Sequence, residues 1–300
     1  TPMGLLEQYG SDAVRYWASS ARLGLDAAFE ETQIKIGRRL AIKVLNASKF
    51  ALSMGIPWDA DEVTVAAAPA PCLDASVVSE PIDRAVLAAL ADVVDTATAA
   101  FEEFGHARAL EVTESFFWTF CDDYIELVKD RANDFDGSHD AAAVRSARAT
   151  LAIAVDTFVR LLAPFLPFAT EEVWSWYRSG SVHRAAWPQS VGLREASAGA
   201  DAELVARAGA ALAALRKVKS EAKTSQKTPI LSVTLAVAAD RPEYAEAIEA
   251  VRADLTEAAK VTGPFTVEQA AQAADSESAD GAASVAVTAA ELGEAPAKKK

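Results

Sequence analysis

Residues 34–52, IKIGRRLAIKVLNASKFAL, contain five basic residues and no acidic one. At about 100° of rotation per residue in an α-helix, the polar and basic side chains fall within an arc of roughly 140°, opposite the apolar and small ones. The pattern predicts a long amphipathic helix that packs by one face and presents the other to a partner. The polar arc comprises Lys35, Arg38, Arg39, Lys43, Asn46 and Lys49. The apolar face comprises Leu40, Ala41, Val44, Ser48, Ala51 and Leu52.

The basic arc contrasts with the charge of the whole chain. The 300 residues include 29 Lys and Arg against 43 Asp and Glu, a formal net charge of -14. Such a chain is unsuited to indiscriminate binding of polyanions, so a nucleic-acid site must be local. Phe50 projects beside the arc, and an aromatic ring among cations suits an unpaired base together with phosphates. The arc therefore predicts an RNA-binding surface, and the alternative is a solvated helix face that balances nearby carboxylates.

Apolar residues recur every three or four positions in the segments that follow. Residues 80–102, 105–131 and 144–162 each carry such a stripe and predict long helices. Pro164 and Pro167 are expected to kink or end the last of them. The expected fold is mainly α, an antiparallel helical bundle. Several aromatic residues are interpreted as packing residues of this bundle: Trp118, Tyr124, Phe165, Phe168 and Trp174.

The pattern changes after residues 192–199, which are rich in Gly, Ser and Ala and predict a domain boundary. Residues 201–290 are expected to form a small α+β domain, because the β-branched alternation at 230–237 predicts a strand between helices. A second basic cluster in this domain includes Arg216, Lys217 and Lys219. It indicates either another RNA contact or a solvated helix end, where cations are favoured. Residues 291–300 predict a disordered tail.

Composition argues against several other classes of protein. Two cysteines without ligand spacing and three separate histidines predict neither a disulfide framework nor a metal site. No catalytic residue is predicted, since adjacent carboxylates such as Asp122 and Asp123 point about 100° apart on a helix. The lack of a signal pattern and of a bilayer-length apolar run predicts a cytoplasmic protein without a membrane partner. Because the chain opens with Thr1-Pro2, we expect it to be part of a longer polypeptide.

Several segments resemble, in order and spacing, the class I aminoacyl-tRNA synthetases of the valine, isoleucine and leucine group. They are GSDAVRYW at 10–17, GRRLAIKVLNASKF at 37–50, FCDDYIELVK at 120–129 and LLAPFLPFATEEVW at 161–174. The opening, with ARLGLDAAFEE at 21–31, is most similar to the bacterial valyl-tRNA synthetases. The resemblance is strong over residues 1–190 and weak beyond them. Residues 201–300 lack the sustained heptads of the coiled-coil arm that ends the commonest bacterial valyl enzymes.

The resemblance implies a division of roles along the chain. Residues 1–30 would end the stem-contact region that follows the catalytic domain, and residues 31–190 would form the anticodon-binding domain. Lys49 and Phe50 align with a basic and aromatic pair that touches the anticodon loop in the valyl family. The other polar residues of the arc would contact the anticodon stem-loop.

The resemblance also implies an activity for the intact protein. That protein would ligate valine to its tRNA, with ATP and Mg as cofactors, and would act as a monomer. The family's catalytic, ATP-binding and editing motifs are not in this sequence, so the chain itself is expected to need no cofactor and to bind valine isoacceptors of tRNA. Two alternatives remain open, the same region of an isoleucyl-tRNA synthetase and a helical protein-interaction scaffold.

Overall fold

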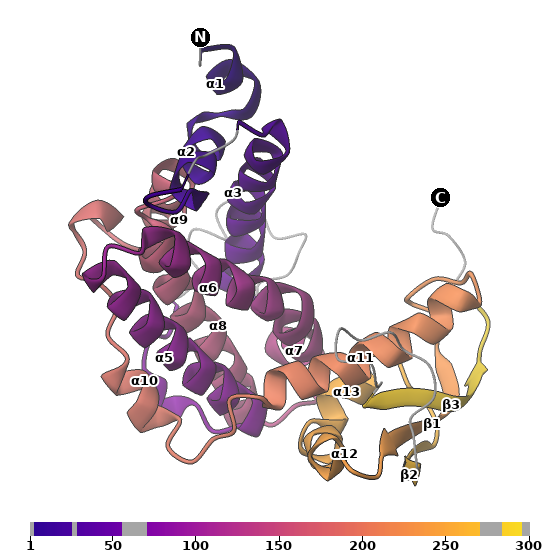
Figure 1. Ribbon diagram of the computed structural model, residues 1–300. Helices are drawn as coiled ribbons and strands as arrows, with labels where there is room; N and C mark the ends of the chain where they lie inside the picture. The colour runs from indigo at the N-terminus through magenta and orange to yellow at the C-terminus, as the bar shows by residue number, and fades with distance from the viewer. Residues whose placement is uncertain (1–2, 26–28, 56–70, 271–283, 296–300) are drawn as a thin grey trace. The chain divides into compact units, whose positions relative to one another are not determined.

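The computed structural model describes residues 3–25, 29–55, 71–270 and 284–295. The chain forms two compact units (Figure 1). The first comprises Thr1–Cys121 and Ala132–Ala200, and the second comprises Asp122–Arg131 and Asp201–Lys300. The division into stem-contact, anticodon-binding and C-terminal parts concerns function and stays a prediction.

The first unit is built of α-helices, so the predicted helical bundle is confirmed. Helix α8 (Ala141–Leu162) contacts α3, α5, α6 and α9, which makes it the central element (Figure 1). The other helices are α1 (Met3–Tyr9), α2 (Ser11–Ser20), α3 (Glu31–Leu52), α5 (Pro81–Glu102), α6 (His106–Thr119), α9 (Pro167–Ser175) and α10 (Val191–Ala196), with short 3₁₀ turns η1 (Ala75–Val77) and η3 (Val182–Arg184).

The core of the first unit lies along α8. Residues 149–159 of this helix are all buried. The Phe158 ring lies 5.3 Å, between centroids, from both Phe117 and Phe120. Asp156 is also buried, but its carboxylate accepts hydrogen bonds from Arg160 at 2.6 Å and Arg178 at 2.9 Å. Because a buried charge is tolerated only when it is paired, these two guanidinium groups allow Asp156 to face the core.

Helices α2 and α3 approach each other closely at Gly37. A Cβ atom at this position would lie 2.5 Å from the Cβ and 2.7 Å from the Cγ of Tyr16. The Tyr16 ring is buried, and its hydroxyl donates a hydrogen bond of 2.7 Å to Glu114 of α6. Burial raises the pKa of Tyr16, and the hydrogen bond to the Glu114 carboxylate raises it further. Gly37 is therefore the position at which α3 can pack directly on this ring.

A carboxylate of α2 caps the start of α9. The backbone N–H groups of Phe168 and Ala169 donate to the Asp12 carboxylate at 3.1 and 2.8 Å. A negative charge at a helix N-terminus is stabilising, because it faces N–H groups that have no partner within the helix. The Phe168 ring, predicted to pack, is 66% exposed, so that prediction is wrong. Phe165 and Trp174 are buried as predicted.

The helix predicted over residues 105–131 is interrupted. A π-helical turn, η2 (Phe120–Tyr124), follows α6 directly, and α7 (Ile125–Asn133) follows η2. A π-turn inserts an extra residue and so shifts the phase of the helix. Apolar residues recur every three or four positions both before and after the π-turn, so the sequence pattern gave no sign of the interruption.

The second unit is an α+β fold, as predicted. Its three-stranded sheet has the order β2-β1-β3, with β1 parallel to β2 and antiparallel to β3. Inside this unit, Arg131 makes two hydrogen bonds of 2.9 and 3.0 Å to the buried Asp254. The elements are α11 (Leu204–Glu221), β1 (Ile230–Ala238), α12 (Pro242–Ala250), α13 (Arg252–Ala258), β2 (Phe265–Ala270) and β3 (Val285–Leu292).

The tail predicted to be disordered, residues 291–300, includes the last two residues of strand β3. Glu291 and Leu292 belong to β3 and pair with Ser232 and Ile230 of β1. Residues 296–300 of that tail lie outside the described residues.

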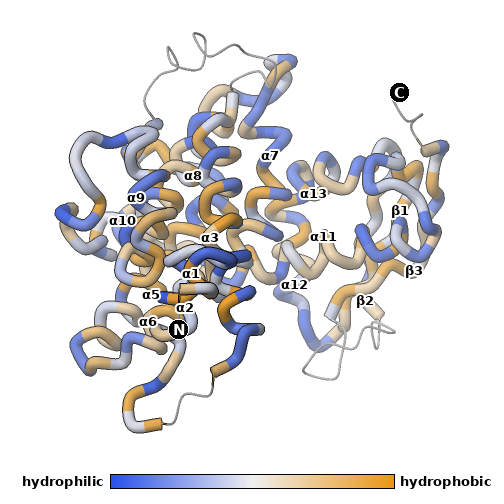
Figure 2. Tube along the Cα trace, turned by 90° about the horizontal axis from the view of Figure 1, so that it is seen from above, coloured by the Kyte–Doolittle hydropathy of each residue, from blue (hydrophilic) through white to orange (hydrophobic). Residues whose placement is uncertain are grey.

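Hydrophilic and hydrophobic colours alternate along the helices in Figure 2. In the described part of the chain, none of the helices combines the length and the apolar character needed to span a bilayer.

We expect Gly37→Ala to destabilise the first unit. The new methyl group would overlap the Tyr16 side chain at its Cβ and Cγ, so α2 and α3 must move apart. Overpacking of this kind lowers the free energy of unfolding by about 1–3 kcal/mol. The matched control is Gly192→Ala in α10, where an added Cβ meets no atom within 4 Å. Thermal unfolding should show a lower midpoint for the first variant only, and equal midpoints would contradict this packing.

Candidate nucleic-acid interface

Helix α3 turns its predicted apolar face into the first unit. Leu40, Val44, Ser48 and Ala51 are buried, while the other two members of that face are half-buried. The helix packs against α2, α8 and α9. Because the buried stripe follows the helical repeat, it determines the direction in which the opposite face points.

The polar arc faces solvent. Five of its six members are exposed, and Lys43 is half-buried. The Phe50 side chain is exposed as well, at 41%. Ile42 is 46% exposed and lies inside the same arc. The interpretation by charge missed Ile42, although its angular position on the helix could have indicated it.

Two cations at the start of α3 already have partners within the first unit. Lys35 lies 3.0 Å from Glu31, whose carboxylate also accepts a hydrogen bond from the hydroxyl of Tyr9. The hydrogen bond and charge of Glu31 raise the pKa of Lys35. Arg38 donates a hydrogen bond of 2.7 Å to the backbone oxygen of Gln8. These two cations therefore hold α1 against α3.

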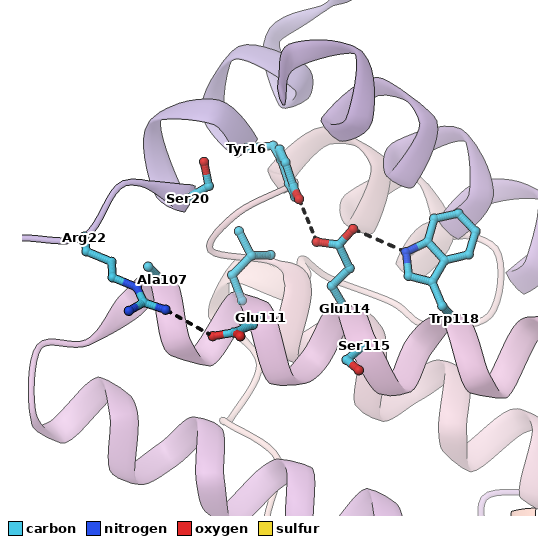
Figure 3. A pocket seen from close by; sticks show the side chains of 9 residues that line it. Tyr16, Ser20, Arg22, Ala107, Glu111, Glu114, Ser115 and Trp118 are labelled. Atoms are coloured by element: carbon cyan, nitrogen blue, oxygen red, sulfur yellow. Dashed lines mark hydrogen bonds and ion pairs between the residues drawn. The ribbon is translucent and has the colours of Figure 1, made fainter. Parts of the chain in front are cut away.

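Lys43 is positioned by an aromatic ring of α6. Its Nζ atom lies 5.4 Å from the centroid of the Trp118 ring, a cation–π arrangement. The Trp118 indole donates a hydrogen bond of 3.2 Å to Glu114, which also accepts one from Tyr16 (Figure 3). The Trp118 ring is thus held in place by the Glu114 carboxylate, which accepts hydrogen bonds from two neutral donors.

A cavity of about 400 Å³ lies beside this network (Figure 3). Its polar lining includes Glu111 and Glu114, with the Arg22 guanidinium 3.8 Å from the Glu111 carboxylate. Two carboxylates outweigh one guanidinium, so the cavity is unsuited to a phosphate. The cavity therefore adds no positive charge to the exposed face of α3.

Two cations of α3, one in each half of the helix, are not used by the rest of the unit. Over residues 3–25, 29–55, 71–270 and 284–295, no hydrogen bond or ion pair engages the side chains of Arg39, Asn46 or Lys49. Phe50 lies next to Lys49 at the end of the same helix. This stretch combines accessible positive charge, an amide and an exposed ring, the groups that hold phosphates and stack bases.

The second basic cluster does not form a comparable surface. Lys219 is 1% exposed, and its ammonium donates to the backbone oxygens of Ala259 at 2.6 Å and Gln226 at 3.0 Å. The predicted RNA contact at Lys219 is wrong for this conformation, because the charge is enclosed. Arg216 donates a hydrogen bond of 2.5 Å to Glu126, and Lys217 lies 3.8 Å from Glu221. Local sequence could not reveal these partners, since two of them come from distant segments.

The loop between α7 and α8 brings together possible metal ligands that the sequence did not indicate. Ligand atoms of Asp134, Asp136 and His139 lie within 4.8 Å of one another. One oxygen of Asp134 accepts a hydrogen bond of 3.0 Å from the backbone N–H of His139 and lies 3.0 Å from its Nδ1. The backbone hydrogen bond from His139 lowers the pKa of Asp134. These contacts fold the loop, and no metal is assigned to it.

An exposed cationic and aromatic stripe on a helical bundle is the arrangement of an RNA-binding helical domain. Comparison with known families agrees with this class. Residues 83–235 match the family described as the anticodon-binding domain of tRNA ligase, and the chain belongs to that family. Helix α3 precedes the matched residues, but it packs against α8 and α9, which lie within them.

Individual relatives are similar over nearly the whole chain. A valine–tRNA ligase of Bifidobacterium longum (strain NCC 2705) is 53% identical over 98% of this chain and 32% of its own length. Those of Thermobifida fusca and Cutibacterium acnes are 52% and 42% identical, over 87% and 100% of this chain and 27% and 30% of their own lengths. The chain thus spans about a third of these relatives. The alignment with the Bifidobacterium relative extends beyond residue 190, since it covers nearly the whole chain.

The burial of Lys219 predicts a pH-dependent stability of the second unit. Desolvation, together with the charges of Lys260 and Arg216, lowers the pKa of Lys219 to about 8. The unfolded lysine has a pKa of about 10.4, so between these values the unfolded chain binds more protons. The free energy of unfolding should therefore rise as the pH increases from 8 to 10.

Thermal unfolding of the wild type and Lys219→Met at pH 7.5 and 9.5 tests this linkage. The methionine variant should lose stability at both pH values, because the Gln226 and Ala259 carbonyls lose their donor. The difference between the two proteins should be larger at pH 9.5. A difference that is equal at the two pH values would show that Lys219 does not titrate in this range.

Proposed function

We propose that this chain is the tRNA-recognition part of a valine–tRNA ligase and binds the anticodon arm of valine tRNA. Membership of the anticodon-binding family and 53% identity to the Bifidobacterium longum valine–tRNA ligase support the proposal. The observation that carries it is the polar arc of α3, where Arg39, Asn46, Lys49 and Phe50 are all exposed.

Some of the exposed groups of α3 would contact the RNA backbone, and others would contact a base. Lys49 and Arg39 neutralise phosphates and release their counterions, which supplies affinity without sequence preference. The Phe50 ring offers a stacking surface to one unpaired base of the loop. Asn46 provides an amide that both donates and accepts hydrogen bonds. Lys43, held over Trp118, and Lys35 and Arg38, which are already paired, belong to the same stripe.

The rest of the proposed enzyme would supply the chemistry. In this proposal the intact protein is a cytoplasmic monomer that ligates valine to tRNA with ATP and Mg²⁺. The sequence of this chain contains neither the His-Ile-Gly-His type motif nor the Lys-Met-Ser-Lys-Ser loop of the family. Valine activation and editing are therefore assigned to the other two thirds of the protein.

The two alternatives receive less support. The Bifidobacterium, Thermobifida and Cutibacterium relatives are valine–tRNA ligases, which favours valine over isoleucine. A protein-interaction scaffold would not require an exposed aromatic ring among unpaired cations. A pull-down that persists after nuclease treatment would nevertheless favour the scaffold.

An electrophoretic shift tests the proposal with valine and isoleucine tRNA transcripts, each in its natural form and with the anticodons exchanged. We expect the valine anticodon to confer tighter binding in either tRNA body. Measurement at two salt concentrations separates the phosphate contribution, because each neutralised phosphate adds roughly 0.7 to 0.9 to the log–log slope. Binding that is weak and indifferent to the anticodon would refute the proposal.

Two lysines of α3 provide a matched pair of variants. Lys49→Ala should weaken binding of valine tRNA and reduce the salt slope by roughly one phosphate contact, about 0.7 to 0.9. Lys35→Ala removes the same charge from the same helix, but Lys35 is paired with Glu31, so its slope should stay close to that of the wild type. Equal effects of the two variants would indicate general attraction to the protein and not a defined contact.

A further inference from the structure

Arg148 of α8 joins two segments that lie far apart in the sequence. Its Nε and Nη2 atoms donate hydrogen bonds of 2.7 and 3.0 Å to the backbone oxygens of Ala132 and Asn133, at the end of α7. The same guanidinium lies against Gly55, just after α3, where an added Cβ would be 2.5 Å from the Arg148 Cζ. The start of the α7–α8 loop is therefore held beside the C-terminal end of α3.

The α7–α8 loop, residues 134–140, is folded so that its aromatic side chain points away from the core. Asp134 and Gly137 adopt positive φ angles of 43° and 68°, which turn the chain sharply. Phe135, between these two turns, is 59% exposed. The nearest comparable ring on α3 is Phe50, which is 41% exposed and precedes Gly55 by five residues.

The carboxylates of this loop are occupied by its own backbone. Asp134 accepts from the N–H of His139 at 3.0 Å, and Asp136 accepts from that of Ser138 at 3.1 Å. Asp140 caps α8 by accepting from the N–H groups of its first turn at 2.8 and 3.1 Å. These hydrogen bonds favour the charged forms of the carboxylates and fold the loop around them, and the Phe135 ring is left exposed.

We propose that the α7–α8 loop is a second RNA-contacting segment. In this proposal Phe135 stacks on an unpaired base of the same anticodon loop that Lys49 and Phe50 bind. This inference rests on the proposed function and adds a contact that lies nearly 90 residues from α3. Arg145, exposed one helical turn before Arg148 on α8, is placed to meet an adjacent phosphate.

The surroundings of Phe135 favour RNA over a protein partner. The ring stands alone among polar loop residues, whereas protein interfaces have contiguous apolar cores. A single exposed ring such as Phe135 suits stacking on an unpaired base. The loop also lies beside the surface already proposed, because Arg148 contacts both the end of α7, where the loop begins, and Gly55 just after α3.

Binding of the valine tRNA transcript to the full chain tests this contact. Phe135→Ala should weaken binding by roughly 5- to 150-fold, the range expected for loss of one base–aromatic stack. The salt slope should not change, because no phosphate contact is lost. Phe104→Ala is the matched control, since Phe104 is 78% exposed in the turn between α5 and α6. That variant should bind like the wild type.

A photo-crosslink gives a positional readout that a folding defect would not mimic. Benzoylphenylalanine replacing Phe135 should crosslink to the anticodon loop of the transcript, and the same group replacing Phe104 should not. Normal binding by Phe135→Ala, together with weakened binding by Lys49→Ala, would overturn the second contact and leave the proposed function standing. Normal binding by both variants would overturn both proposals, and a crosslink elsewhere in the tRNA would overturn the base contact.

The role of Arg148 can be tested by coupling. Arg148→Lys cannot make both hydrogen bonds in the same geometry, so the loop should lose its position beside α3. Phe135→Ala should then have little further effect on binding in the lysine background. Full additivity of the two substitutions would show that Arg148 does not position Phe135.

Discussion

The burial of one face of α3 determines where its cations point. Leu40, Val44 and Ala51 pack into the first unit, and the rigid helical repeat then directs Lys49 and Phe50 to solvent. A rotation of the helix by one residue would bury charge at a large energetic cost. The same hydrophobic contacts that stabilise the unit therefore also orient its proposed RNA-binding surface, and Gly37 against Tyr16 brings the helix close enough for those contacts.

Cations of similar appearance have different roles along the stripe. Lys35 is paired with Glu31 of the same helix, Arg38 donates to α1, and Lys43 is held over Trp118. Arg39 and Lys49 have no such partners among the described residues. Because a paired cation must give up its partner before it binds a phosphate, Arg39 and Lys49 are the cations best suited to the proposed RNA contact.

In the second unit, basic residues that are close in the sequence have internal partners in the structure. Arg216 and Lys219 lie in the same basic cluster, yet one is paired with Glu126 and the other is enclosed by two backbone carbonyls. Their partners lie on α7, after α13 and in the turn before β1, so they appear only when the chain is folded. The unit is shared with the valine–tRNA ligase relatives over nearly its full length, and its cations serve its own stability in this structure.

The sequence alone determined most of the helices, the α+β character of the second unit and the two faces of α3, because apolar periodicity and helix-ending residues act over a few neighbouring positions. It also located Phe50 beside the cations. Tertiary structure alone decided which of those cations are used internally, where η2 shifts the phase of a long helix, and that Arg148 holds the Phe135 loop beside α3. These features depend on contacts between segments tens of residues apart, whose partners no local pattern specifies.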